Sequence, residues 1–222
     1  MNIVAVNASP RKNKNTATIL QHALDGAKAA RPDIQTELVH LYDHSFTGCR
    51  SCFQCKRLGG KFYGTCAVKD GLTPVLEKLA RSDAIVFGSP IYFGNVTGML
   101  RMLEERLLFP WLVYAENWPS LAPKKYRAAF VYTMNVTEEV MREWGYPEHL
   151  GKMESYIWKF LGSDPEVLYV HNTVQFDDYG KYKCELFSGE DKARWREAHF
   201  PEDCKKAEAL GARLVAGPES RA

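Results

Sequence analysis

The sequence lacks a strong excess of charge of either sign. Its 222 residues include 29 lysines and arginines and 27 aspartates and glutamates, a formal net charge of +2. This balance gives no reason to expect a nucleic acid or an anionic membrane surface as a partner. No apolar run approaches the ~20 residues of a membrane span, and the chain opens on a short strand pattern without a signal-peptide pattern. We therefore expect a cytoplasmic protein with no membrane partner.

Two familiar phosphate-binding motifs are also missing. The absence of G-x-x-x-x-G-K-[ST] argues against a nucleotide triphosphatase. The turn after the first apolar run has none of the glycines of G-x-G-x-x-G, which a pyrophosphate needs for close approach to the backbone. The histidines are scattered, with no nucleophile at triad spacing. These absences leave a site for a single terminal phosphate as the simplest interpretation of a basic first turn.

Short apolar runs alternate with helical patterns along the chain. The runs lie at residues 3–6, 37–42, 84–87, 128–132 and 167–170, and the helical patterns at 16–31, 73–81, 97–107 and 148–161. This alternation is typical of parallel βαβ units. It predicts an α/β fold, a three-layer doubly wound parallel five-stranded sheet of flavodoxin-like strand order 2-1-3-4-5. The ligand crevice is then expected at the carboxyl ends of strands one and three, where the winding reverses.

The C-terminal quarter has a different composition. Residues 175–200 are rich in charge and aromatics and show no strand pattern, and Pro201 is suited to begin a helix that runs to residue 215. We predict one domain over residues 1–216, with a charged, aromatic C-terminal extension from about 175. Residues 217–222 are expected to be a frayed tail.

The turn at residues 7–17 is the most informative segment. It follows the first strand and precedes the first helix, so free backbone N–H groups and the positive end of the helix dipole favour an anion there. Arg11, Lys12 and Lys14 add positive charge, and neighbouring serine, asparagine and threonine side chains add neutral donors. The pattern predicts a phosphate site, the alternative being an ordinary polar loop.

Two further loops should face the same crevice. The loop at residues 88–98 holds Tyr92 and Phe93 between glycines and a proline, which offers a flat aromatic face with polar groups beside it. The loop at 133–137 adds a second polar edge. One phosphate turn with one stacking loop suits a mononucleotide that carries a large ring system, and FMN meets that description.

The residues of the first turn and of the loop at 88–98 resemble those of a known protein group. Ser9-Pro10-Arg11 with Asn15-Thr16-Ala17, followed by the loop that begins Gly88-Ser89-Pro90, is similar to the NADPH-dependent FMN reductase and iron–sulfur flavoprotein group of the flavodoxin-like superfamily. The resemblance covers roughly residues 1–135. It implies that the phosphate is bound by Ser9, Arg11, Asn15, Thr16 and Ala17. It implies that the isoalloxazine ring is bound by Pro90, Ile91, Tyr92, Phe93, Gly94 and Asn95, with Thr133, Met134 and Asn135 beside it.

The activity implied is that of an FMN-dependent oxidoreductase. Such a protein passes reducing equivalents from NAD(P)H, a transient co-substrate, through FMN to a small-molecule acceptor such as a quinone or a free flavin. The flavin carries the chemistry, so no catalytic side chain is assigned. The alternative is an iron–sulfur flavoprotein that carries electrons between partners, and a third hypothesis is a flavin-binding regulatory or scaffold protein.

Four cysteines lie close together in the sequence. Cys49, Cys52 and Cys55 have the C-x2-C-x2-C spacing of a 4Fe–4S site, with Cys66 as the fourth candidate ligand. In iron–sulfur flavoproteins the fourth cysteine follows more closely, whereas ten residues intervene here. Loop-closure entropy does not exclude a cluster. The departure in spacing favours free thiols or a disulfide, and a cluster or a structural zinc site stays open.

An apolar run at residues 107–114 follows the third predicted helix. It is too apolar for a free surface, because large exposed apolar patches are rare on soluble monomers. We predict that it packs over the flavin or at the interface of a homodimer or higher homo-oligomer that includes Phe109, Trp111 and Tyr114.

Overall fold

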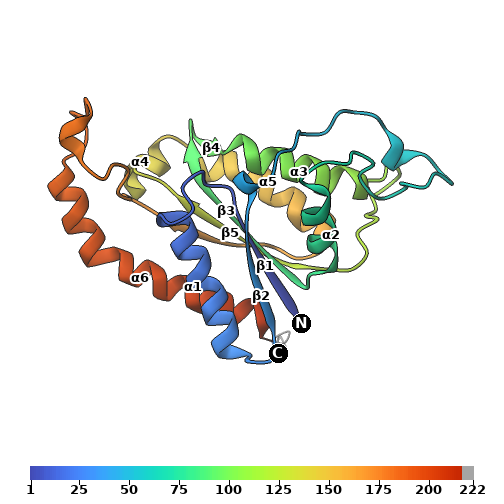
Figure 1. Cartoon of the computed structure of the whole chain (residues 1–222), viewed down its shortest axis with the longest axis horizontal. Helices are drawn as coiled ribbons and strands as arrows, with labels where there is room; N and C mark the ends of the chain where they lie inside the picture. The colour runs from blue at the N-terminus through green and yellow to red at the C-terminus, as the bar shows by residue number, and fades with distance from the viewer. Residues whose placement is uncertain (217–222) are drawn as a thin grey trace.

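The computed structural model describes residues 1–216, which form a parallel sheet with helices on both faces (Figure 1). The sheet order is β2-β1-β3-β5-β6, and every neighbouring pair on that path is parallel. The strands are β1 (Asn2–Asn7), β2 (Gln35–His40), β3 (Ala84–Tyr92), β5 (Arg127–Thr133) and β6 (Glu166–Val170). The predicted order 2-1-3-4-5 of the five long strands is therefore confirmed. A further short strand, β4 (Asn95–Val96), pairs antiparallel with the end of β3 and was not predicted.

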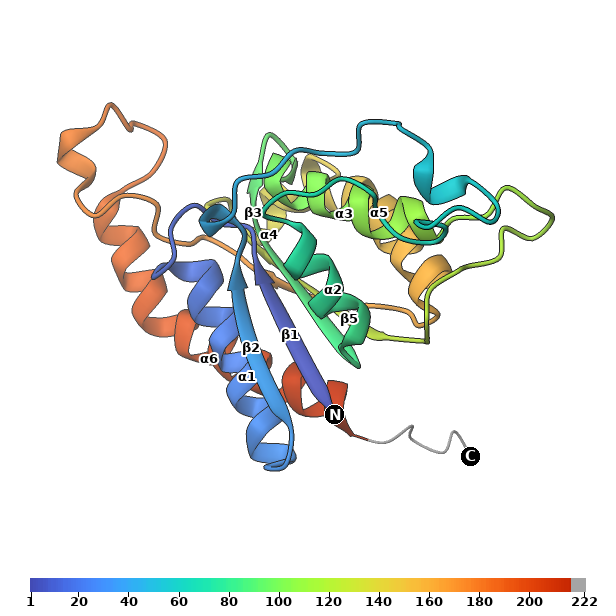
Figure 2. The ribbon, with the colours of Figure 1, turned by 45° about the vertical axis from the view of Figure 1, so that its right-hand side comes forward.

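The helices form two layers (Figures 1 and 2). One layer holds α1 (Asn15–Ala30) and α6 (Gly189–Val215), and the other holds α2 (Thr73–Arg81), α3 (Gly98–Trp111), α4 (Glu138–Glu143) and α5 (Tyr146–Leu161). Strand side chains alternate between the layers: Ile3 and Ala5 pack toward α1 and α6, whereas Val4 and Val6 pack toward the opposite layer. Both faces are covered, which explains the uninterrupted apolar runs. Within residues 1–216, no helix is long and apolar enough to cross a membrane.

The last helix is longer than the sequence predicts. We expected it to begin at Pro201, but α6 begins at Gly189 and carries Pro201 in its interior. Its first turn is capped by Ser188, whose side chain accepts a hydrogen bond from Asp191 N at 3.2 Å. Packing on α1 offsets the hydrogen bond that the proline removes. The predicted tail at 217–222 lies outside the described residues.

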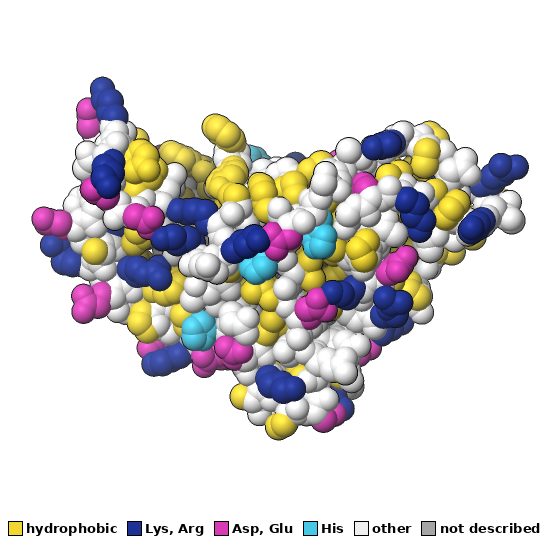
Figure 3. Space-filling view, in the orientation of Figure 1, with side chains coloured by type: hydrophobic (Ala, Val, Ile, Leu, Met, Phe, Trp, Pro, Cys, Tyr) yellow, Lys and Arg dark blue, Asp and Glu magenta, His cyan; other side chains and the backbone are white. Residues whose placement is uncertain are grey.

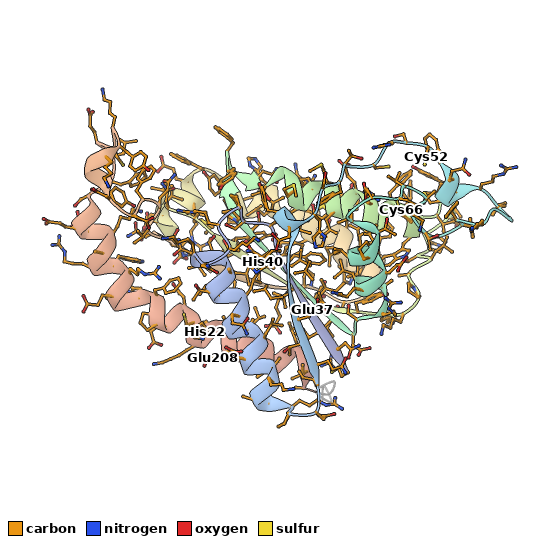
Figure 4. All side chains as sticks on the ribbon, in the orientation of Figure 1. His22, Glu37, His40, Cys52, Cys66 and Glu208 are labelled. Carbon is orange, nitrogen blue, oxygen red and sulfur yellow. The ribbon has the colours of Figure 1, made fainter. Side chains whose placement is uncertain are left out.

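Two glycines set the spacing of α1 and α6. A Cβ at Gly26 would lie 2.1 Å from Glu208 O, and a Cβ at Gly211 would lie 1.7 Å from Ala23 O. Both would collide with backbone, so the helices cross where neither has a side chain. At this crossing, His22 Nδ1 of α1 lies 2.7 Å from Glu208 Oε1 of α6 (Figure 4). The long helix is therefore fixed against the first one.

Trp111 is a core residue, which corrects its predicted place at a dimer interface or over a flavin. Its side chain is buried and its ring stacks on Tyr126, with centroids 5.6 Å apart. The apolar run at 107–114 therefore points partly inward, and Leu107 and Leu108 are buried with it. At its surface end, Tyr114 is exposed and its ring contacts the half-buried Phe109 edge to face.

A glutamate side chain of α3 is buried in the core. The side chain of Glu104 is 2% exposed and pairs with Arg101 at 3.1 Å, while its second oxygen has no hydrogen-bond partner among the described residues. Burial raises the pKa of Glu104 to about 7. The folded chain therefore binds a proton at Glu104 that the unfolded chain releases near the usual glutamate value.

We expect Glu104→Gln to stabilise the chain in a pH-dependent way. The pKa of Glu104 is higher in the folded chain than in the unfolded chain, so the free energy of unfolding of the wild type falls as pH rises from about 4.5 to 7. The variant has no carboxyl group at this position and lacks this loss. We compare the free energy of unfolding of the variant with that of the wild type at each pH. The difference in favour of the variant should be about 2 kcal/mol larger at pH 8 than at pH 5. Urea denaturation at both pH values measures this. Glu143→Gln, at an exposed position, is the control, and an equal difference at both pH values would contradict the prediction.

Candidate functional site

The carboxyl ends of β1, β3 and β5 open into one cavity of about 450 Å³. Its walls come from four segments that are distant in sequence: the first turn, the end of β3, the end of β5 and the chain that follows β6. The lining residues are Ser9, Arg11, Lys14, Asn15, Thr16, Pro90, Ile91, Tyr92, Thr133, Met134, Asn135, Thr173, Gln175, Phe176, Asp177 and Tyr182. The crevice thus lies at the topological switch point, as the predicted strand order requires.

The first turn is held in shape by its own side chains. Ser9 N donates to Asn7 Oδ1 at 3.0 Å, and Arg11 N donates to Ser9 Oγ at 3.2 Å. The N-cap of α1 is Lys14, which provides no side-chain cap, and the first helical bond runs from Thr18 N to Lys14 O at 3.0 Å. The N–H groups of the first turn of α1 are therefore directed at whatever occupies this end of the cavity.

The second segment is a hairpin. Ile91 pairs with Val96 and Tyr92 with Asn95, which leaves Phe93 and Gly94 as the two turn residues. Both have positive φ, 52° and 73°, as a type I′ turn requires. Pro90, Ile91 and Tyr92 line the cavity, whereas Phe93 is fully exposed at the tip.

Four of the residues predicted to bind FMN do not line this cavity: Ala17, which is buried in α1, and Phe93, Gly94 and Asn95 of the hairpin. The backbone of the tight turn carries the last three beyond the rim. The other predicted residues all lie in its wall, including Thr16 and Thr133, whose hydroxyls are hydrogen-bonded at 2.7 Å and buried. The structure brings these segments together, while their role in cofactor binding stays a prediction.

The loop after β5 is anchored from α6. Lys192 is buried, and its ammonium donates to Asn135 O and to Asn172 Oδ1. Burial lowers the pKa of Lys192 to about 8. On the other side, Asn135 Nδ2 donates to Gln175 Oε1 at 2.9 Å. The C-terminal third therefore fixes the loop that forms the far wall of the cavity.

The chain after β6 was missed as part of the site. Thr173 N donates to Met134 O at 2.9 Å, and the rings of Phe176 and Tyr182 stack with centroids 4.2 Å apart at the cavity wall. One feature of the sequence could have indicated that this segment lies at the site. This polar and aromatic segment follows a parallel strand, so it emerges at the same sheet edge as the other loops.

The four clustered cysteines lie around a separate small hollow of about 20 Å³ at the far end of the molecule (Figure 4). Cys49 and Cys52 are exposed and Cys55 is buried, which raises the pKa of the Cys55 thiol. Arg106 Nε lies 3.4 Å from Cys66 Sγ. Among residues 1–216, no three metal-ligating side chains are gathered closely enough to hold a metal ion. The thiols are thus neighbours without forming a coordination shell.

Charges of both signs are mixed on the face of the molecule drawn in Figure 3. At the first turn two cations, Arg11 and Lys14, line the cavity together with one carboxylate, Asp177. This arrangement favours a small anionic ligand over an extended polyanion.

The profile of the NADPH-dependent FMN reductase family matches residues 1–120. The chain belongs to this family. An iron–sulfur flavoprotein from Archaeoglobus fulgidus is 38% identical over 106 residues, which are 48% of each chain. Another, from Methanocaldococcus jannaschii, is 34% identical over 106 residues, 48% of this chain and 51% of the relative. The chain therefore matches about half the length of these relatives.

Solved structures share the fold along nearly the whole chain. An NAD(P)H:quinone oxidoreductase from Methanothermobacter marburgensis has a TM-score of 0.69 and 16% identity, with 96% of this chain and 98% of that chain covered. An FMN-dependent NADH-azoreductase from Bacillus anthracis, in complex with FMN, has a TM-score of 0.65 and 13% identity, with 97% and 100% covered. These likenesses establish the flavodoxin-like fold.

Proposed function

We propose that the chain is an FMN-dependent oxidoreductase that passes reducing equivalents from NAD(P)H to a small-molecule acceptor such as a quinone or a flavin. The observation that carries the proposal is one cavity, walled by a basic helix N-terminus at one end and by Tyr92 and the β5 loop elsewhere. Family membership and the FMN-containing structural neighbour support it.

The donor set fits FMN. Arg11, Lys14 and the first-turn N–H groups of α1 would hold the phosphate, because they combine charge with directed backbone donors. Tyr92 would contact the ring, and Asn135 would offer a polar group at its edge. When bound, FMN would supply the hydride-accepting and electron-donating chemistry. The protein's own part is to bind, to orient and to exclude water.

A steady-state assay tests the proposal. One cavity has to serve the hydride donor and the acceptor in turn, so NADH or NADPH with a quinone acceptor should give ping-pong kinetics. Negligible reduction by either nucleotide, together with rapid reduction by a ferredoxin, would contradict the proposed donor.

We also propose a cytoplasmic homodimer or higher homo-oligomer. Phe109 and the exposed Tyr114 stay in the proposed interface, and Trp111 does not. Sedimentation at micromolar concentration measures the assembly, and a monomer would contradict this part of the proposal.

The second candidate is an iron–sulfur flavoprotein that carries electrons. The observation in its favour is that Cys49, Cys52, Cys55 and Cys66 line one hollow despite the longer spacing before Cys66. The names of the curated relatives support it. Four thiols match the donor set of a four-iron cluster, and to hold one they would have to lie closer together than they do in the described residues.

Iron analysis separates the candidates. If the cysteines hold a cluster, the anaerobically purified chain should contain about four irons and four acid-labile sulfides, and Cys52→Ser should abolish both. Cys184→Ser, at a cysteine outside the hollow, is the matched control and should change neither value. Iron near zero in the wild-type chain would remove the second candidate.

A further inference from the structure

Residues 174–177 lie directly against the first turn. Three side chains of that turn donate hydrogen bonds to acceptors in this short segment. The bonds run from Asn15 Nδ2 to Val174 O at 2.9 Å, from Arg11 to Gln175 O, and from Lys14 to the Asp177 carboxylate. The segment therefore presents carbonyl and carboxylate oxygens to the same donors that would bind the phosphate of FMN.

Asp177 changes the charge of the cavity. The charged residues in its wall are Arg11, Lys14 and Asp177, so one carboxylate opposes two cations. The Asp177 side chain is 84% exposed and that of Lys14 is 46% exposed. An ion pair this exposed is weak, because water screens it. A phosphate, with up to two negative charges and three acceptor oxygens, is a stronger partner for the same ammonium group.

The position of Asp177 does not depend on Lys14 alone. Gln175, two residues before it, is bonded to Asn135, and Gln175 N donates to the Tyr179 hydroxyl at 3.1 Å. Phe176 stacks on Tyr182. The segment lies beyond residue 120, outside the region that matches the family profile. Its carboxylate is held at the cavity by these neighbouring contacts.

On the basis of the proposed FMN function, we propose that Asp177 is a specificity-determining residue whose carboxylate competes with the cofactor's phosphate for Lys14. It lowers the affinity for FMN and does not affect a flavin that lacks the phosphate. The ratio of FMN to riboflavin affinity is therefore set partly by a residue of the C-terminal extension.

Fluorescence titration of the full chain with FMN and with riboflavin tests this role. Asp177→Asn should bind FMN about twofold to fivefold more tightly, the size expected for one exposed charge pair, and should bind riboflavin as wild type does. Asp178→Asn is the matched control, since Asp178 bonds to Gly180 N and does not line the cavity. In a Lys14→Gln background, the gain from Asp177→Asn should shrink.

Two results would contradict the proposed competition between the Asp177 carboxylate and the phosphate of FMN. One is FMN affinity in Asp177→Asn that equals or falls below the wild-type value. The other is a gain that persists undiminished without Lys14, because the carboxylate would then act by general repulsion. A wild-type chain that binds FMN and riboflavin equally is a different outcome, and it would refute the phosphate assignment itself.

Discussion

Replacing Arg11 and Lys14 together by glutamine will weaken FMN binding about hundredfold and leave riboflavin binding within about twofold. Both cations line the cavity beside the N-terminus of α1. A charge-assisted hydrogen bond contributes about 1.5 kcal/mol or more, and each 1.4 kcal/mol is tenfold in affinity. Riboflavin has no phosphate and so does not use them. Titration of both flavins by fluorescence measures the two losses.

Lys12→Gln is the control for this pair. Lys12 belongs to the same turn, but it pairs with Asp43 and does not line the cavity. Its replacement should leave both affinities near wild type. Equal losses of FMN and riboflavin in the Arg11 and Lys14 double variant would show that the phosphate lies elsewhere.

Gly211→Ala will reduce the free energy of unfolding by about 3 kcal/mol, as expected for overpacking against backbone. In most helix interiors the same substitution stabilises by up to about 1 kcal/mol. Here the sign reverses because the added Cβ would lie 1.7 Å from Ala23 O, so α6 has to move away from α1. Urea denaturation measures the loss.

Gly151→Ala provides the matched control within a helix. A Cβ at Gly151 would have Glu154 Oε2 as its nearest neighbour at 4.0 Å, an ordinary contact. This variant should be as stable as wild type or slightly more stable. A Gly211→Ala chain as stable as wild type would contradict the close crossing of α1 and α6.

Much of the sheet could be predicted because local pattern and burial agree there. Residues 3–6 and 84–87 are apolar without interruption, and they lie in strands covered on both faces. The strand order was expected from the flavodoxin-like pattern of doubly wound sheets, and the structure has this order. The predicted run at 37–42 ends two residues beyond strand β2, since Leu41 and Tyr42 continue the apolar pattern but belong to a 3-10 turn at residues 41–43.

The two parts of the site differ in how far the sequence reveals them. Arg11 and Asn15 lie between the first strand and the first helix. The rules for a strand-to-helix turn are therefore sufficient to predict that they face the crevice. Gln175 and Asp177 reach the cavity through long-range contacts with the first turn and with the loop after β5. No local periodicity encodes such contacts. The same holds for α6, where Pro201 signals a helix start but packing on α1 extends the helix through it.

Anaerobic mixing of the FMN-loaded chain with NADPH or NADH in a stopped-flow spectrometer tests the proposed function most directly. We expect one nucleotide to bleach the oxidised flavin absorption in a single rapid phase, and we expect added quinone to restore it. A flavin that stays oxidised with both nucleotides, in a chain shown to hold stoichiometric FMN, would contradict the proposed oxidoreductase function.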